Sequence, residues 1–434
     1  MALKSTIAAL SSGAGRAGIA VIRVSGGAAL EVLDQLAGSR PPAREARLRV
    51  LRNEAGDPLD EALVLWFPEG ASFTGEDLVE LHCHGSFAVV RAVLSTITEH
   101  PDSRLAEPGE FTLRAFQNGR IDLAGAEALG DLINAETEEQ RKRSVRMLGG
   151  DLHRRVNVWR QELLHALALV EVTIDWADEE VPEDVSPEVS SVLDRLIERL
   201  DRELETSHAA ERLRVGFEVA LLGAPNSGKS SFINYLSGRE AAITSPIPGT
   251  TRDIVELRYD LAGIPVHFLD MAGLRDTDDP VESEGVRRAC TRAEAADLRL
   301  KLVSPDAVFP AAFEHLIQAH DIQVLTKRDL WEPPDALSIS SVTGAGVGDL
   351  LKEIETFLAN KISSAGILGH ARQKAAVEAG RNALDLARNQ LETAPDEVIA
   401  EHLRLAAREL ARVIGAIDVE DVLGDVFANF CMGK

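Results

Sequence analysis

Eight residues, Gly223 to Ser230, constrain the fold of this chain more than any other feature. They read Gly-Ala-Pro-Asn-Ser-Gly-Lys-Ser and match the pattern G-x-x-x-x-G-K-[ST] in full. A short apolar run, 215–222, precedes them and a helical pattern, 231–236, follows them. This order of strand, loop and helix is typical of a phosphate-binding loop, in which backbone N–H groups and a helix N-terminus surround phosphate oxygens. It predicts an α/β domain that binds a nucleoside phosphate.

Three side chains of this loop suit specific roles. Lys229 can reach the β and γ phosphates, and Ser230 can ligate Mg²⁺. Asn226 has two interpretations that the residues alone leave open: its oxygen ligates a monovalent cation beside the phosphates, or it is an ordinary turn residue. The nucleotide contacts expected in this loop are Gly223, Asn226, Ser227, Gly228, Lys229, Ser230 and Ser231.

Two elements for the γ-phosphate side follow in the order that a GTPase requires. The loop Gly249-Thr250-Thr251-Arg252-Asp253 offers hydroxyl groups that can complete the shell of Mg²⁺. The run 266–273 is a strand that ends in D-x-x-G, where Asp270 can hold Mg²⁺ through water and the Gly273 N–H can contact the γ-phosphate. Each element is weak alone, but their order and spacing together favour a GTPase.

Two further elements suit guanine. Thr326-Lys327-Arg328-Asp329 resembles the N-K-x-D motif, and a carboxylate at Asp329 can accept both guanine N–H groups. Ser338-Ile339-Ser340-Ser341 resembles the loop that contacts the guanine oxygen. Thr326 replaces the usual Asn, and its shorter side chain predicts a modest affinity for guanine.

The means of hydrolysis departs from that of Ras-like proteins. The residue after D-x-x-G is Leu274, where a Gln would position the attacking water. The acidic loop that follows offers Glu282 and Glu284 as candidates, although on the residues alone an ordinary solvated loop is the preferred interpretation of both. A second departure lies in the run 298–303, where charges interrupt an otherwise apolar strand. A buried parallel strand is normally apolar throughout, so we expect this strand near an edge or poorly covered.

The patterning divides the chain into segments. Strands are expected at 19–24, 62–67 and 78–84, and helical periodicity begins near residue 121. Strands and helices alternate from 215 to about 358, and helical periodicity resumes from 373. We therefore expect a multidomain α/β and all-α protein. Its parts are an N-terminal α/β domain (1–118), a helical domain in two segments (119–212 and 361–434) that pack together, and an inserted Ras-like P-loop domain (213–360).

Composition narrows the class of protein. The net charge is −24, which disfavours non-specific binding of nucleic acid. The cationic cluster Arg141, Lys142, Arg143, Arg146, Arg154 and Arg155 is either a solvated helix face, which we favour slightly, or a patch for an anionic partner. Three scattered cysteines predict neither a disulfide framework nor a zinc site, and a reducing cytoplasm is the simplest setting. We expect no signal peptide and no membrane span.

With both ends of the chain, these residues resemble the MnmE (TrmE) family of tRNA-modifying GTPases over essentially the whole length. The most specific markers lie outside the GTPase segment. They are Phe73-Thr-Gly-Glu-Asp77 with Glu80, Pro108 to Phe116, Asn118-Gly-Arg-Ile-Asp-Leu123, and the ending Cys431-Met-Gly-Lys434.

The resemblance implies a folate-binding N-terminal domain that also forms a homodimer. Arg23, Glu80, Arg120 and Lys434 would bind the tetrahydrofolate derivative (5-formyl- or 5,10-methylene-tetrahydrofolate). A carboxylate suits the N–H groups of a pterin and cations suit its glutamate tail. Cys431 would be a catalytic residue in the same region.

The resemblance also implies the cation sites of the GTPase segment. K⁺ would be held by Asn226, Ser245, Ile247 and Thr250, and Mg²⁺ by Ser230 and Thr251. Glu282 would orient the hydrolytic water, which selects it over Glu284. The remaining nucleotide contacts would be Ser245, Thr250, Thr251, Asp270, Gly273, Thr326, Lys327, Asp329, Ser340 and Ser341.

The family acts with a flavoprotein, MnmG, as a heterotetramer. The resemblance therefore implies a K⁺-stimulated GTPase that helps to install an aminomethyl-type (carboxymethylaminomethyl) group at carbon 5 of the wobble uridine of certain tRNAs. Tetrahydrofolate would supply the carbon, and glycine or ammonium the nitrogen. The alternative function is a GTP-dependent switch in ribosome or RNA assembly, but such proteins carry basic RNA-binding modules that this acidic chain lacks.

Overall fold

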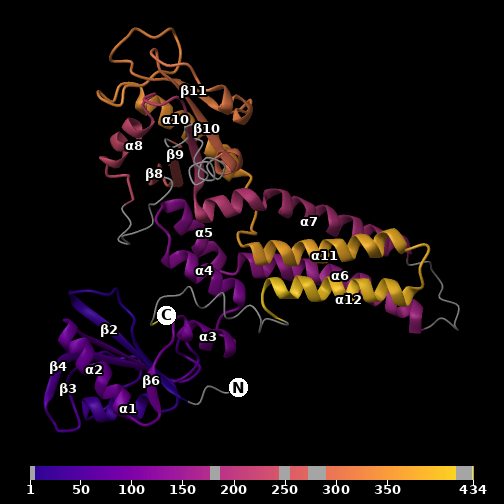
Figure 1. Ribbon diagram of the computed structural model, residues 1–434. Coiled ribbons are helices and arrows are strands. Elements are labelled where there is room, and N and C mark those ends of the chain that lie inside the picture. The colour runs from indigo at the N-terminus through magenta and orange to yellow at the C-terminus, as the bar shows by residue number, and fades with distance from the viewer. Residues whose placement is uncertain (1–4, 176–185, 244–254, 272–289, 417–432, 434) are drawn as a thin grey trace, which may run out of the picture. The chain divides into compact units, whose positions relative to one another are not determined.

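The computed structural model describes residues 5–175, 186–243, 255–271, 290–416 and 433, which form two compact units (Figure 1). The first unit contains the described residues up to Gly130, together with 414–416 and Gly433. The second contains the described residues of 131–413. Among the described helices, none is both long and apolar enough to cross a membrane.

A six-stranded sheet forms the centre of the first unit, in the order β3-β4-β5-β2-β1-β6. Only β1 and β6 pair in parallel; the other neighbours are antiparallel. The predicted strands at 19–24, 62–67 and 78–84 are confirmed within β2, β4 and β5. The sequence interpretation missed the other three. The strands are β1 (Thr6–Leu10), β2 (Ala17–Ser25), β3 (Arg47–Arg52), β4 (Pro58–Phe67), β5 (Leu78–Gly85) and β6 (Ser103–Leu105).

Helices cover the two faces of this sheet unequally. Ala8 of β1 belongs to the larger apolar cluster, which includes residues of α1 (Ala29–Ala37) and α2 (Phe87–Glu99). Its neighbours Ile7 and Ala9 pack instead with Phe111 of α3 (Glu110–Gln117). Because successive strand residues point to opposite faces, α3 lies on the face opposite α1 and α2.

The second unit contains a five-stranded sheet in the order β11-β10-β7-β9-β8. Its strands are β7 (Phe217–Leu222), β8 (Val255–Leu261), β9 (Ile264–Asp270), β10 (Leu298–Val303) and β11 (Ile322–Leu325). Only β8 is antiparallel to its neighbour. The helices α8 (Lys229–Ser237) and α10 (Val347–Ser363) pack on the apolar core of this sheet, and a 3₁₀ helix, η1 (Ala311–Leu316), precedes β11.

Of two sequence expectations about this sheet, one is wrong at its boundary and the other is confirmed. The apolar run that we expected as a strand from Val215 begins as the last residue of a helix, and Gly216, with φ of 119°, separates that helix from β7. The charged strand β10 lies near an edge, as expected, because only β11 lies beyond it, and it is well covered, since it pairs with both β7 and β11. Arg299 of β10 is 1% exposed and forms an ion pair with Asp321 at 2.7 Å.

The remaining helices of the second unit come from both sides of the sheet segment. They are α5 (Glu138–Leu148), α6 (Asp151–Asp175), α7 (Ser186–Val215), α11 (Ala371–Gln390) and α12 (Asp396–Val413); α4 (Leu123–Ile133) begins in the first unit. Helices α6, α7, α11 and α12 lie side by side (Figure 1), and ion pairs such as Arg381–Asp201 at 2.8 Å join the early segment to the late one. The expectation that the two helical segments pack together is confirmed.

Helix α5 holds both connections to the five-stranded sheet. Gln140 donates to the carbonyl of Arg214 at 2.8 Å, just before β7. Arg143 donates to the carbonyls of Gly366 and Ile367 at 2.9 and 3.0 Å, after α10. Burial lowers the pKa of Arg143 to about 10. Both the strand that enters the sheet and the segment that leaves it are therefore anchored on one helix.

Candidate functional site

The phosphate-binding loop lies at the carboxyl end of β7, where ligands bind in open α/β sheets. Asn226 and Gly228 have φ of 62° and 101°, and these left-handed conformations turn the loop into the start of α8. A Cβ atom at Gly223 would lie 2.5 Å from Ser227 Oγ and 2.6 Å from the Leu302 carbonyl oxygen, so only glycine fits there. The expected loop geometry is present.

Lys229 points into the loop. Its Nζ donates to the carbonyls of Gly223 and Ala224, each at 2.8 Å, and the side chain is almost fully buried. Burial lowers the pKa of Lys229, with the Asp270 carboxylate acting in the opposite direction. A desolvated ammonium held by neutral carbonyls attracts an anion strongly, which suits the role of binding phosphate oxygens.

Ser230 and Asp270 lie together beside the loop. Ser230 Oγ donates to Asp270 Oδ2 at 2.7 Å, while Asp270 Oδ1 is buried and has no hydrogen-bond partner among the described residues. A buried carboxylate oxygen without a partner is costly unless a ligand meets it. Hydroxyl and carboxylate oxygens are the ligands that Mg²⁺ prefers, so the donor set fits this ion. The described residues contain no cluster of three or more His, Cys, Asp and Glu side chains that could hold another metal.

Thr326 ties the base-binding side to the phosphate loop. Its hydroxyl donates to the Ser227 carbonyl at 2.7 Å and lies 3.3 Å from the carbonyl of Val303. Sequence reasoning considered only the lost amide contacts of Asn, and it missed this tie. The shorter side chain still connects the two halves of the site.

Asp306 and Trp331, which contact the base motif, were missed by sequence reasoning. Lys327 has φ of 59° and forms an ion pair with Asp306 at 2.7 Å, which fixes its ammonium at the rim. Trp331 donates from its ring N–H to the Thr326 carbonyl at 2.9 Å. Trp331 could have been predicted to support the motif, because it lies two residues after Asp329 in the sequence. Asp306 could not, because it lies on a loop that is distant in the sequence.

One cavity of about 470 Å³ joins the phosphate loop to the base motif. Ser340 does not line it, but its Oγ accepts from the N–H groups of Val342 and Thr343, which shapes the loop that does. The expected nucleotide residues that line the cavity are Gly223, Asn226, Gly228, Lys229, Ser230, Ser231, Thr326, Lys327, Asp329 and Ser341. The expected residues Ser245, Ile247, Thr250, Thr251, Gly273 and Glu282 lie outside the described part of the chain.

A second polar site lies on the six-stranded sheet. Arg23 of β2 and Glu80 of β5 are register partners, and Arg23 Nε donates to Glu80 Oε1 at 2.8 Å. His82 lies 3.4 Å from the other Glu80 oxygen. Arg120 follows α3, and its Cγ lies 3.3 Å from the position of a Cβ on Gly75.

The end of the chain reaches the same unit. The Gly433 carbonyl accepts a hydrogen bond from Ser11 Oγ at 2.8 Å, after the end of β1. Cys431 and Lys434 lie outside the described residues. The structure thus places Gly433 against the unit that contains the six-stranded sheet.

The cationic cluster on α5 and α6 is mostly paired. Arg141 and Lys142 bond to Glu138 and Glu139, Arg146 and Arg154 to Asp151, and Arg155 to Glu203. Arg143 is used by the main-chain carbonyls after α10. This pairing favours the interpretation as a solvated helix face over a patch for an anionic partner.

The fold and the cavity define a P-loop G domain, carried by a helical domain that follows an N-terminal α/β domain. Two family models match the chain: the N-terminus of the GTP-binding protein TrmE over residues 6–120, and the MnmE helical domain over residues 123–431. The chain belongs to the MnmE (TrmE) family.

Relatives match over their full length. One from Dinoroseobacter shibae, described as tRNA modification GTPase MnmE, is 50% identical over 430 residues, which is 99% of this chain and 100% of the relative. Another of the same description, from Roseobacter denitrificans, is 47% identical over 434 residues, with the same coverage. Among solved structures, the G domain of the FeoB iron transporter of T. maritima is 24% identical, covers 32% of this chain and 98% of its own, and has a TM-score of 0.25.

Proposed function

We propose that the chain is a GTP hydrolase that acts in tRNA modification. The full-length likeness to relatives described as tRNA modification GTPases supports the tRNA part. One observation carries the nucleotide part: a single cavity contains Lys229 and Ser230 at one end and Asp329 at the other. In a GTP molecule bound there, the phosphates would contact Lys229 and Ser230 while the guanine N–H groups donate to Asp329.

In this proposal, different residues of the cavity bind the phosphates and the guanine base. Backbone N–H groups of the phosphate loop and Lys229 bind the β and γ phosphates. Asp329 accepts the guanine N–H groups, and the loop of Ser340 and Ser341 contacts the guanine oxygen. Gly273 contacts the γ-phosphate, and Glu282 orients the attacking water.

Cations complete the site in this proposal. Ser230 and Thr251 would hold Mg²⁺, and the unpartnered oxygen of Asp270 supports that placement. Asn226, Ser245, Ile247 and Thr250 would hold K⁺. Asn226 lines the cavity from a left-handed turn, which supports its share of the role. The cations supply positive charge that offsets the charge developing on the phosphates.

We further propose that Arg23, Glu80, Arg120 and Lys434 bind a tetrahydrofolate derivative, with Cys431 acting nearby. The Arg23–Glu80 pair supports this, because it presents an acceptor and donors side by side on the sheet. The folate would supply a one-carbon unit for the wobble uridine. Glu80 would orient the pterin and the cations would bind its glutamate tail.

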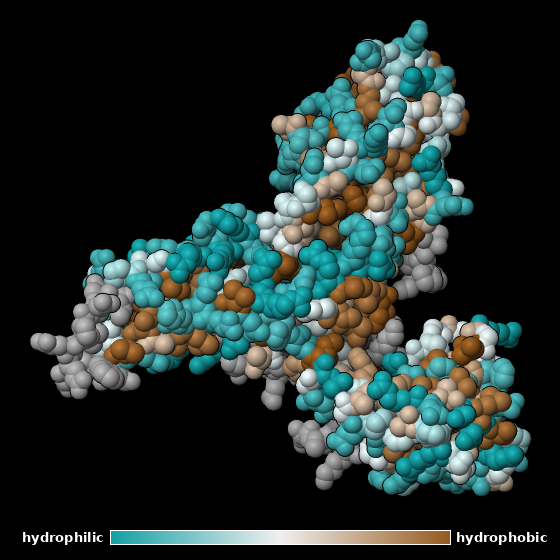
Figure 2. Space-filling view, turned by 180° about the vertical axis from the view of Figure 1, so that it is seen from behind, coloured by the Kyte–Doolittle hydropathy of each residue, from teal (hydrophilic) through white to brown (hydrophobic). Residues whose placement is uncertain are grey.

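The proposed partners are a second copy of the chain, the flavoprotein MnmG and, through that complex, tRNA. Support for the homodimer comes from apolar side chains on the sheet face that carries Glu80. Leu48 and Leu63 are register partners in β3 and β4 and are 58% and 38% exposed. Figure 2 shows apolar residues at the surface of this unit. Exposed apolar patches of this kind mark interfaces.

The remaining proposals concern location and boundaries. We propose a cytoplasmic protein with an N-terminal folate and dimerisation domain at 1–118, helical segments at 119–212 and 361–434, and a G domain at 213–360. The contacts of α5 with both connections of the five-stranded sheet support the description of the G domain as an insertion.

Mass spectrometry of wobble nucleosides from cells that lack the protein tests the proposed function. We expect carboxymethylaminomethyl-type uridines to disappear and to return with the wild-type gene but not with Lys229→Ala. An unchanged nucleoside profile in the deletion strain would refute a role in tRNA modification.

A further inference from the structure

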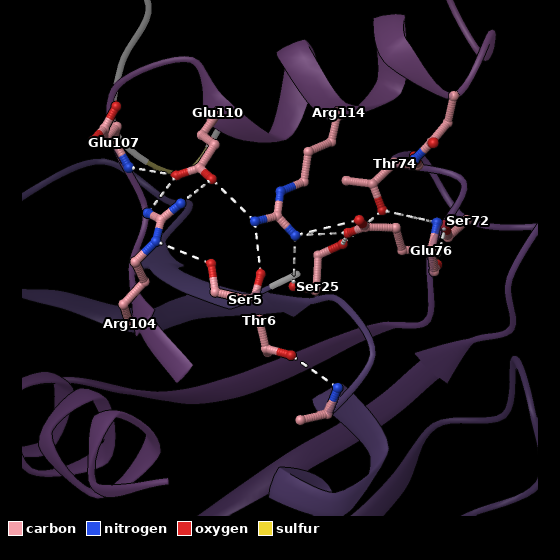
Figure 3. A network of polar contacts seen from close by, with 12 residues as sticks. Ser5, Thr6, Ser25, Ser72, Thr74, Glu76, Arg104, Glu107, Glu110 and Arg114 are labelled. Atoms are coloured by element: carbon pink, nitrogen blue, oxygen red, sulfur yellow. Dashed lines mark hydrogen bonds and ion pairs between the residues drawn. The ribbon is translucent and has the colours of Figure 1, made fainter. Parts of the chain in front are cut away.

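A cluster of charged side chains, of which Arg114 and Glu110 are buried, links α3 to the loop 72–77 in the first unit (Figure 3). The Arg114 side chain of α3 is 1% exposed. Its Nη1 donates to Glu76 at 3.0 Å, and its Nη2 donates to Glu110 at 3.0 Å and to the Ser5 carbonyl at 2.8 Å. Glu110 also forms a two-pronged pair with Arg104. Two arginines thus face two glutamates, so the cluster is neutral as a whole.

Within this cluster, the Glu110 carboxylate is held in its charged form. Burial would raise the pKa of Glu110, but hydrogen bonds from Arg104, the Glu107 N–H and Arg114 outweigh it and keep the pKa below its usual value. Arg114 and Glu110 are 1% and 5% exposed, and removing one partner of a buried ion pair is strongly destabilising. The cluster therefore acts as a rigid anchor between α3 and the loop 72–77.

The loop 72–77 is built on this anchor. Ser25 Oγ donates to Glu76 Oε2 at 2.8 Å and lies 2.7 Å from Thr74 Oγ1. Ser72 Oγ donates to the Glu76 carbonyl at 2.5 Å. Figure 3 shows these side chains converging beside the Arg114 guanidinium. The backbone of Thr74 and Gly75 is consequently fixed relative to the sheet.

The turn that carries Arg120 is attached to this fixed loop by one side chain. Asn118 Nδ2 donates to the Thr74 carbonyl at 2.7 Å. Gly75 has φ of 82°, and a Cβ there would lie 2.9 Å from Asn118 Cβ and 3.3 Å from Arg120 Cγ. The stem of Arg120 therefore lies directly against Gly75, and a larger residue would displace it.

This turn lies on the sheet side that carries the Arg23–Glu80 pair. Ala9 of β1 is the register partner of Arg23, which is the partner of Glu80, so all three side chains share one face. Ala9 packs with Phe111 of α3, and Arg120 directly follows that helix. Helix α3 thus packs on the sheet face that carries the Arg23–Glu80 ion pair.

We propose that Asn118 is a positioning residue for Arg120: it fastens the Arg120 turn to a loop that the Arg104–Glu110–Arg114–Glu76 cluster holds rigid. The inference rests on the proposed folate site and assigns no ligand contact to Asn118 itself. Its physical basis is preorganisation, since a long Arg side chain held in one place loses less entropy when it binds an anion.

A double-mutant cycle on the full-length protein tests this, with the affinity for 5-formyl-tetrahydrofolate measured by calorimetry. Arg120→Ala and Asn118→Ala should each weaken binding about tenfold or more, because positioning losses of this size are typical. The double variant should bind no more weakly than Arg120→Ala alone. Asn118→Leu, which keeps the side-chain size, should behave as Asn118→Ala does and serves if the smaller residue impairs folding.

Asn53→Ala is the matched control, because Asn53 also ties a turn of the same unit, through hydrogen bonds to Asp57. It should leave folate affinity unchanged, and GTP hydrolysis should be unchanged in every variant. Wild-type affinity in both Asn118 variants, or fully additive losses in the double variant, would overturn the inference while leaving the folate site in place. Wild-type affinity in Arg120→Ala would overturn both.

Discussion

The Thr326 hydroxyl donates a hydrogen bond to the Ser227 main-chain carbonyl, with 2.7 Å between the two oxygens. Thr326 belongs to the base motif and Ser227 to the phosphate loop, so this bond fixes the separation of the two ends of the nucleotide cavity. Both residues are buried, and a carbonyl left without its donor there would be costly.

Thr326→Val should therefore weaken GTP binding about tenfold, which corresponds to about 1.4 kcal/mol. Valine keeps the shape of threonine and removes only the hydroxyl. Thr326→Ser, which keeps the hydroxyl, is the control and should bind within about twofold of wild type. Titration with a fluorescent, non-hydrolysable GTP analogue gives the affinities, and equal affinities for the Val and Ser variants would contradict the assignment.

Ser230→Ala should abolish the gain in nucleotide affinity that Mg²⁺ provides, because it removes the hydroxyl beside Asp270. Binding of GTP would be measured in Mg²⁺ and in EDTA. Ser237→Ala is the matched control on the same helix, since its hydroxyl bonds only to the Ile233 carbonyl in the described structure. If Ser230→Ala kept the full Mg²⁺ effect, Ser230 would not be a ligand.

Asn226→Gly should remove the preference for K⁺ over Na⁺ in GTP hydrolysis. Asn226 has φ of 62°, so glycine keeps the backbone conformation, whereas alanine would add strain that confuses the result. Hydrolysis rates in equal concentrations of KCl and NaCl measure the preference. A variant that still hydrolyses faster in K⁺ would show that Asn226 is not needed as a cation ligand.

Arg299→Met should destabilise β10 by about 3–5 kcal/mol, because it leaves the buried Asp321 without its partner. Arg299 also donates to the carbonyls of Ala293, Glu294 and Ala296. We therefore expect the segment 293–296, just before β10, to become less ordered in the variant as well. Hydrogen exchange of peptides from β10 and β11 reports this directly. Lys301→Met, on the same strand but paired with an exposed Glu314, should change exchange little.

Leu48→Glu combined with Leu63→Glu should convert the proposed homodimer to a monomer, because it places charge on the apolar sheet face. Sedimentation would measure the oligomeric state. Val308→Glu, at a side chain that is 89% exposed in the other unit, controls for added charge. A double variant that stayed dimeric would exclude this face as the contact.

The sequence predicted the phosphate loop because its requirements are local. Glycines at Gly223 and Gly228 serve close approach and a left-handed turn, and the strand and helix on either side are adjacent in the chain. The family membership and the packing of the helical segments were also predicted correctly.

The missed features depend on contacts between distant residues. Arg299 in β10 is compatible with burial because Asp321 and three main-chain carbonyls pair with it, and no periodicity reveals those partners. The hydrogen bond from Thr326 to the Ser227 carbonyl could not be predicted by comparing Thr with the usual Asn, because the two residues are 99 positions apart in the sequence. The strand β6 is too short, at three residues, to show alternation.

Helix α5 holds the chain at Arg214, just before the five-stranded sheet begins, and again at Gly366 and Ile367, after α10. A domain joined to its neighbour at one point can rotate freely about that point. The domain of the five-stranded sheet is held at two neighbouring points on α5, so its rotation is constrained. We therefore expect a rotation of the nucleotide-binding sheet to turn α7 and α11 together rather than one at a time.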